Sequence, residues 1–124
     1  MRSLALYMLL ATLLIAPIMG CSGTTTREVV IYDFQVEERS ELSISFRLHS
    51  QWTNGCGEVS GFSSRLEGNR YSVRMFGEQP TNAGCTDNMK PISGVWSTRV
   101  PSPGKYMFSF RHEGIPLDTT IVFE

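Results

Sequence analysis

Side chains able to carry catalysis are few in this chain of 124 residues. His49 and His112 are its two histidines, and each has the chemistry of a general acid or base. No nucleophile accompanies them in a known arrangement, because Ser60-Gly61 lacks the flanking glycine of a nucleophile elbow. The chain also has no phosphate-cradling glycine loop. We therefore expect a protein that is not an enzyme and that uses no cofactor.

The N-terminal residues form a pattern that ends at a cysteine and is typical of a cleaved signal. Arg2 precedes an apolar stretch over residues 4–18, which is too short for a permanent membrane-spanning helix. Small Gly20 stands directly before Cys21. The segment Ile18-Met19-Gly20-Cys21 resembles the lipobox of bacterial lipoprotein signal peptides, with the cysteine at the invariant position. The resemblance implies cleavage before Cys21 and a diacylglycerol group on its sulfur.

The same resemblance implies the domain boundaries and the location of the mature protein. Residues 1–20 are expected to be a removed signal peptide, residues 21–27 a flexible lipidated tether, and residues 28–124 the folded domain. Two or three acyl chains such as palmitate retain a protein on a membrane, since each buried methylene contributes about 0.8 kcal/mol. Ser22 follows the cysteine, which implies an outer-membrane protein facing the periplasm if the source has two membranes. The alternative is a plain secretory signal with a coincidental cysteine.

Length and charge limit what the mature domain binds. Removal of the signal peptide leaves about 104 residues, enough for a single domain with a modest core. The whole chain has a formal net charge of −1, and loss of Arg2 brings it to about −2. This near-neutral balance argues against nucleic-acid binding, which needs a concentrated positive field. The expected partners are the membrane, through the lipid on Cys21, and an envelope protein or polymer.

Cys56 and Cys85 remain once Cys21 carries lipid. An even number of cysteines in an oxidising compartment predicts a disulfide between them. The bond would close a loop of about 30 residues and contribute roughly 3 to 4 kcal/mol in the chain-entropy account. The alternative is a metal site made by the same two cysteines with His49 and His112, although the cysteines lack the close spacing of zinc ligands. We expect the disulfide and no metal.

Four side chains are candidates for ligand binding. Arg70 and Arg74 share the polar face of one predicted strand, and Arg47 faces outward on another. Guanidinium groups form paired hydrogen bonds with carboxylates and phosphates, so these arginines are expected to bind acidic groups of an envelope partner. The alternative is ordinary surface salt bridges, with Glu41, Glu58 and Glu67 as partners. Trp52 lies in a predicted loop, where an exposed ring would anchor an interface or, alternatively, would pack against the disulfide.

Alternation of apolar and polar residues predicts an all-β domain. The pattern is clearest where Leu42, Ile44, Phe46 and Leu48 share one face. We expect seven strands, near residues 28–36, 42–49, 59–66, 71–75, 94–100, 106–110 and 117–123. In the first strand the face expected to be buried consists of Val30, Tyr32, Phe34 and Val36, and because Val29 and Ile31 are on its other face, the alternative is a strand partly covered on both sides. Such a succession fits a single small antiparallel β-sandwich, immunoglobulin-like or transthyretin-like, with a small barrel as the alternative.

Together these patterns favour a lipid-anchored envelope protein that acts as a non-catalytic binding or structural module. A periplasmic inhibitor of a host or bacterial hydrolase is the alternative, because small lipid-anchored β proteins with one disulfide include the membrane-bound lysozyme inhibitors. That family has a Ser-Gly-x-x-Tyr motif in its inhibitory loop. Here Ser60-Gly61 is followed by Ser64 in the place of the tyrosine, so the activity is not transferred. A protruding ordered loop at residues 51–57 or 77–92 would favour the inhibitor.

Overall fold

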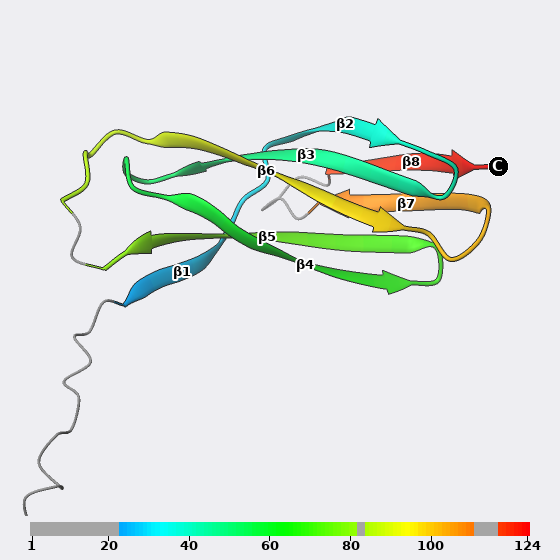
Figure 1. Ribbon diagram of the computed structural model, residues 1–124, viewed down its shortest axis with the longest axis horizontal. Coiled ribbons are helices and arrows are strands. Elements are labelled where there is room, and N and C mark those ends of the chain that lie inside the picture. Colours follow the sequence, from blue (N-terminus) through cyan, green and yellow to red (C-terminus); the bar gives the residue numbers. More distant parts are fainter. Residues whose placement is uncertain (1–22, 82–83, 111–116) are drawn as a thin grey trace, which may run out of the picture.

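The computed structural model describes residues 23–81, 84–110 and 117–124. These residues form eight strands (Figure 1): β1 (Thr24–Val29), β2 (Asp33–Arg39), β3 (Ser43–Trp52), β4 (Glu58–Glu67), β5 (Arg70–Pro80), β6 (Lys90–Arg99), β7 (Gly104–Phe110) and β8 (Leu117–Phe123). Within them no helix is long and apolar enough to cross a membrane. The lipobox-like segment with Cys21 and also His112 lie outside the described residues.

The strands form two sheets that pack as a sandwich, which confirms the predicted all-β fold. One sheet has three strands in the order β2-β3-β6, and the other contains β1, β4, β5, β7 and β8. In the larger sheet β4 pairs with one side of β5, while the other side pairs first with β7 and then with β1. The β5–β7 pairing is parallel, whereas the other pairings are antiparallel as expected.

The predicted alternation produces the core. In β3, Ile44, Phe46 and Leu48 are buried, and β5 and β7 bury every second residue in the same way. The buried side chains are dominated by aromatic rings from both sheets. Phe108 of β7 stacks on Tyr71 of the same sheet with ring centroids 5.0 Å apart, and its ring lies 4.9 Å from that of Phe46 in the other sheet. Ring pairs of this kind add to the hydrophobic stabilisation of a small domain.

The first predicted strand is in fact two strands that belong to different sheets. The chain leaves the five-stranded sheet after Val29 and joins the three-stranded sheet at Asp33. Ile31 is buried in the crossing, whereas Tyr32 is 52% exposed and Val36 is 47% exposed. The expected burial of Tyr32 and Val36 is therefore wrong. Tyr32 lies in the crossing between the two sheets, and Val36 is in register with the buried Phe46 on β2, an edge strand of the three-stranded sheet that leaves its side chain partly uncovered.

The predicted tether over residues 21–27 is also wrong, because strand β1 begins inside that range. Thr24 to Arg27 belong to β1 and pair with the end of β5, with Thr24 in register with Pro80. Just before the strand, the carbonyl of Gly23 accepts a hydrogen bond of 2.8 Å from the backbone N–H of Thr81. The threonines look like a polar linker by composition, but a sheet edge satisfies their backbone groups. The folded domain therefore begins within two residues of Cys21.

Apart from the β1–β2 crossing near the middle, the described turns and loops gather at two opposite ends of the sandwich (Figure 1). One end holds the start of β1, the β3–β4 loop and residues 84–89 before β6, and we call it the disulfide end. The opposite end, here called the far end, holds the β2–β3, β4–β5 and β6–β7 turns and the C-terminus. At the far end a two-residue turn joins β4 to β5, and its Gly68 has a positive φ of 59°. Glycine suits that turn because it adopts this conformation without steric cost.

The predicted disulfide is confirmed. Cys56 and Cys85 are joined, with their Cα atoms 5.5 Å apart, and they link the β3–β4 loop to the segment before β6. A backbone hydrogen bond of 3.0 Å from Gly55 to the carbonyl of Thr86 joins the same two segments. The disulfide end is therefore crosslinked both covalently and by hydrogen bonds.

Candidate functional site

The three candidate arginines point outward, but from two different sheets. Arg70 and Arg74 occupy outward positions of β5, whose alternate residues are buried. Arg47 occupies an outward position of β3 in the smaller sheet. Because the outer faces of a sandwich point away from each other, Arg47 does not share a binding face with the other two. Alternation assigns a residue to one side of its own strand, but it does not say which sheet that strand joins.

The outer face of the five-stranded sheet has a hollow beside Arg74. Its volume is about 230 Å³, and it is lined by Ser72, Val73, Arg74 and Ser109. Along this edge of β5, residues up to Val73 pair with β7 and residues from Met75 onward pair with β1. The hollow lies between these two pairings. Two hydroxyl groups and one guanidinium group thus surround a break in the hydrogen-bond ladder of the sheet. These groups can donate hydrogen bonds to an anionic oxygen.

Ion pairing differs among the arginines of this face. Arg74 pairs with Glu28 of β1, and the hydrogen bond and the charge of that carboxylate raise the Arg74 pKa. Arg65 pairs with Glu67 at 2.8 Å. Arg70 donates a hydrogen bond of 3.3 Å to Ser109 Oγ and makes no ion pair within the part of the chain that the structure describes. Of the three, Arg70 is therefore the most available to a carboxylate or phosphate of a partner.

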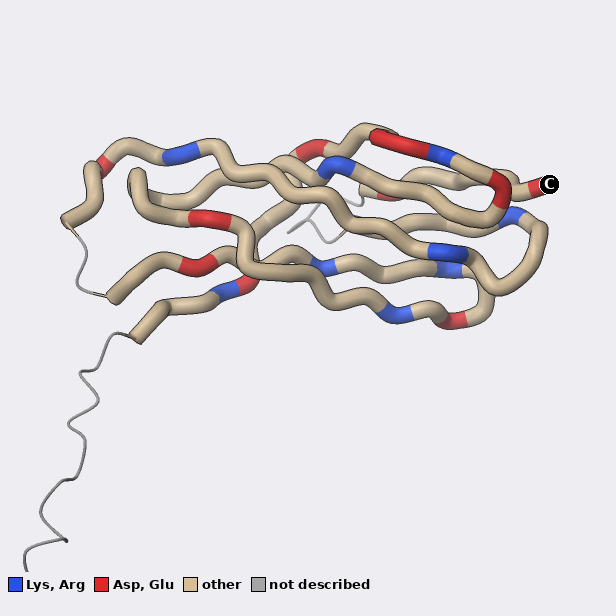
Figure 2. The backbone as a smooth tube through the Cα atoms, viewed as in Figure 1, with Lys and Arg blue, Asp and Glu red and all other residues tan. Residues whose placement is uncertain are grey.

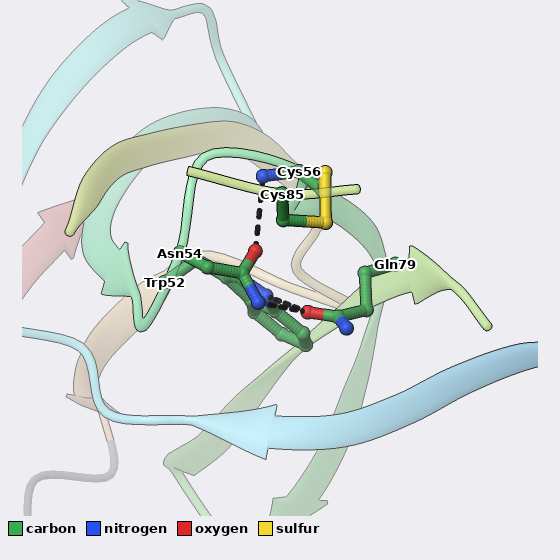
Figure 3. The surroundings of a disulfide bond; sticks show 5 residues. All are labelled: Trp52, Asn54, Cys56, Gln79 and Cys85. Carbon is green, nitrogen blue, oxygen red and sulfur yellow. Dashed lines mark hydrogen bonds between the residues drawn. A yellow bond between two sulfur atoms is a disulfide. The ribbon is translucent and has the colours of Figure 1, made fainter. Parts of the chain in front are cut away.

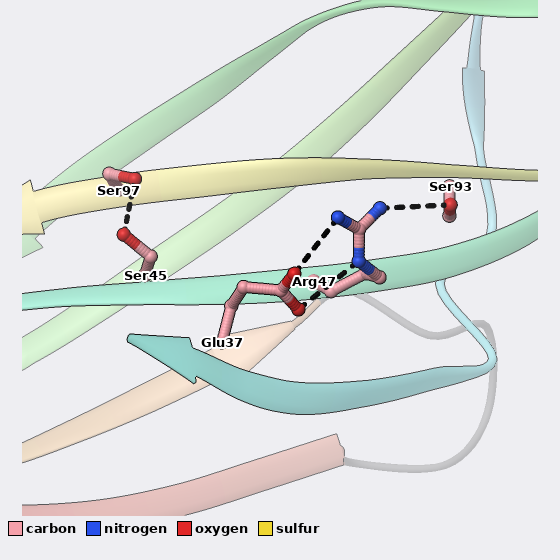
Figure 4. A network of polar contacts seen from close by, with 5 residues as sticks. All are labelled: Glu37, Ser45, Arg47, Ser93 and Ser97. Atoms are coloured by element: carbon pink, nitrogen blue, oxygen red, sulfur yellow. Dashed lines mark hydrogen bonds and ion pairs between the residues drawn. The ribbon is translucent and has the colours of Figure 1, made fainter. Parts of the chain in front are cut away.

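Arg47 is engaged within its own sheet (Figure 4). Its Nη2 and Nε atoms donate to the two carboxylate oxygens of Glu37, at 3.0 Å and 3.2 Å, and Nη1 lies 3.4 Å from Ser93 Oγ. The hydrogen bond from Arg47 and its charge lower the pKa of the Glu37 carboxyl, and the carboxylate raises the Arg47 pKa in turn. This pair connects β2 to β3, so Arg47 forms a surface ion pair, but with Glu37 rather than with one of the expected partners Glu41, Glu58 and Glu67.

Trp52 is buried, so its prediction as an exposed interface anchor is wrong. Only 1% of the residue is exposed. A Cβ added at Gly57 would lie 1.9 Å from the ring, and one added at Gly77 would lie 2.5 Å from it. The ring therefore packs directly against two glycine backbones. A signal for this was present in the sequence, because Trp52 continues the even-numbered inward positions of β3 from Ile44 onward.

The surroundings of Trp52 connect the disulfide to β5 (Figure 3). The Trp52 indole N–H and the Asn54 side-chain amide both donate to Gln79 Oε1, at 2.6 Å and 2.7 Å. Asn54 Oδ1 accepts a hydrogen bond of 3.0 Å from the backbone N–H of Cys56. On the β1 side, the Arg27 guanidinium lies 4.3 Å from the centre of the indole ring. The disulfide end is thus a connected unit that includes the first strand.

The histidines and cysteines do not come together as a metal site in the described residues. Both cysteine sulfurs are bonded to each other, so neither is free to bind a metal as a thiolate. His49 lies on the outer face of β3, in register with Asp33 of β2. Among residues 23–81, 84–110 and 117–124, no three His, Cys, Asp or Glu side chains are grouped to hold an ion. The alternative of a metal site that includes Cys56 and Cys85 is therefore excluded.

None of the protein-family models, curated proteins or solved structures compared with this chain matches it.

Proposed function

We propose that the protein is a lipid-anchored envelope protein whose domain binds an acidic partner, without catalysis, through the outer face of its five-stranded sheet. The observation that carries the binding part is Arg70, which lies beside a hydroxyl-lined hollow and has no carboxylate partner among the described residues. The partner is an envelope protein or a polymer bearing carboxylates or phosphates. The membrane is the outer membrane, on its periplasmic side, if the source has two.

The anchor rests on the lipobox-like segment that ends at Cys21. One structural feature supports it, because a disulfide is typical of an oxidising compartment such as the periplasm. Replacing Cys21 by alanine removes the thiol that would carry the diacylglycerol. The Cys21→Ala protein is expected to stay unprocessed or to leave the detergent phase. Normal cleavage after Gly20 with full retention in the detergent phase would contradict the anchor.

The binding face is tested with charge reversals. The acylated protein is used to capture partners from detergent-solubilised envelope, and the Arg70→Glu/Arg74→Glu variant is compared with the wild type. We expect this variant to lose the captured acidic partner while its melting temperature stays nearly unchanged, because exposed ion pairs contribute little to stability. Arg47→Glu is the matched control, since that arginine lies on the other sheet. Equal loss of capture in both variants would contradict the assignment to the five-stranded sheet.

The hydrolase inhibitor remains the second candidate, and two observations bear on it. Ser60 and Gly61, which match the start of the inhibitory motif, lie within β4 next to a bulge rather than in a loop. The ordered segment most like an inhibitory loop is residues 53–57, which the disulfide holds in place. Assays of envelope and host muramidases with the purified domain test this candidate, and inhibition at stoichiometric concentration would favour it over the binding module.

A further inference from the structure

The start of the folded domain determines which end of the sandwich meets the membrane. Gly23 and Thr24 lie at the disulfide end, where they pair with Thr81 and Pro80 at the end of β5. Cys21 precedes Gly23 by two residues, and two residues of fully extended chain span at most about 7 Å. A lipid on Cys21 therefore cannot reach the bilayer unless the disulfide end is close to it.

The disulfide end also presents an apolar side chain to the surroundings. Met89 is 60% exposed, the highest value among the large apolar side chains of the described residues. It directly precedes Lys90, which is in register with Trp52 at the disulfide end of β3. An exposed methionine contributes hydrophobic free energy when it enters the headgroup and upper acyl region of a bilayer. The position of the chain entry and the exposure of Met89 thus point to the same end.

Charged residues are concentrated away from the disulfide end. Figure 2 shows that more of the Lys, Arg, Asp and Glu positions lie in the half of the molecule that carries the C-terminus and the far-end turns. Burial of charged side chains against lipid costs free energy, so the less charged end is the better one to place at the membrane.

We propose that the disulfide end is a lipid-contacting surface, with Met89 at the headgroup region of the membrane and the far end directed away from it. The proposal deepens the function proposed above and rests on a lipid at Cys21. Arg70 and Pro80 are the two ends of β5, ten residues apart, so they are separated by about 33 Å. The far end, where Arg70 lies, then stands at most about that distance above the bilayer and is presented to a partner in the aqueous space.

Three methionines of the mature chain serve as built-in reporters. Met89 lies at the disulfide end, Met75 is buried in the middle of β5, and Met107 lies near the far end, where its backbone N–H donates to the carbonyl of Asn69 at 2.8 Å. The mature protein, labelled with ¹³C at its methionine methyl groups, is coupled through Cys21 to a maleimide lipid. It is then placed in nanodiscs of phosphatidylethanolamine and phosphatidylglycerol that contain a lipid with a gadolinium chelate on its headgroup.

Paramagnetic broadening falls steeply with distance, so we expect the Met89 methyl signal to disappear while the Met107 signal keeps most of its intensity. A variant with a long Gly-Ser linker between Ser22 and Gly23 is the control, and its Met89 signal should return because the domain is released from the surface. Equal broadening of Met89 and Met107, or stronger broadening of Met107, would overturn the proposal. Chemical coupling makes this result independent of natural acylation, whose absence would be detected separately by the mass of the protein isolated from the envelope.

Discussion

Replacement of Phe108 by alanine is the sharpest test of the packing described above. Phe108 is fully buried, and its ring lies 4.9 Å from that of Phe46, 5.0 Å from that of Tyr71 and 6.0 Å from that of Trp96. Truncation of a buried phenylalanine usually costs about 3 to 5 kcal/mol, because both transfer free energy and packing contacts are lost. Each aromatic pair adds about 0.5 to 1.5 kcal/mol beyond its buried area, so we expect a value near the top of that range.

That loss is large for a domain of this size. Small domains have free energies of unfolding of about 5 to 15 kcal/mol, so Phe108→Ala should remove a third or more of the stability. The melting temperature is expected to fall by at least about 12 °C. Urea unfolding without reductant, followed by tryptophan fluorescence, measures the change because Trp52 and Trp96 are both buried and become exposed on unfolding.

Met107→Ala is the matched control, since Met107 is the neighbouring residue in β7 and is 38% exposed on the outer face. We expect this variant to stay within about 0.5 kcal/mol of the wild type. A cost below about 1 kcal/mol for Phe108→Ala, or equal costs for the two variants, would refute the assignment of the two faces of β7.

Three further predictions concern other parts of the molecule. The Cys56→Ala/Cys85→Ala protein should lose roughly 3 to 4 kcal/mol in urea unfolding, and reductant should then have no further effect on it. Gly77→Ala should lower the melting temperature and change the fluorescence spectrum, because its Cβ would lie 2.5 Å from the buried indole ring. The Glu37 carboxyl should titrate in NMR below the usual range and return to it in Arg47→Gln, since the hydrogen bond from Arg47 lowers its pKa. Because folding lowers the pKa of this carboxyl, its ionisation stabilises the native state at any pH above the ordinary carboxyl pKa. This contribution to stability should disappear as the pH falls below about 4 and passes through the lowered pKa.

Much of the fold was predictable because the alternation of side chains is a local property. The buried faces of β3, β5 and β7 follow from residues such as Phe46, Tyr71 and Phe108 at every second position. The disulfide was predicted because the proposed lipidation of Cys21 would leave two cysteines in an oxidising compartment. Such inferences need only the neighbouring residues or a count.

The candidate site was predicted less well because it depends on how strands assemble. Arg47, Arg70 and Arg74 were correctly placed on polar faces, but only strand pairing separates Arg47 from the others. The burial of Trp52 depends on Gly57 and Gly77, which come from different segments and let the ring approach the backbone. The alternation within β3 indicated that burial, yet the assignment of Trp52 to a predicted loop favoured exposure.

The sequence by itself determined the all-β class, the covalent crosslink and the strands with uninterrupted alternation, since each follows from the period of the extended chain or from cysteine chemistry. Only the tertiary structure decided that residues 28–36 divide between two sheets, that β7 pairs in parallel with β5, and that the threonines after Gly23 form a strand. The physical reason is that backbone hydrogen bonds between strands are nearly independent of side-chain identity. Their partners are therefore chosen by the packing of the whole domain.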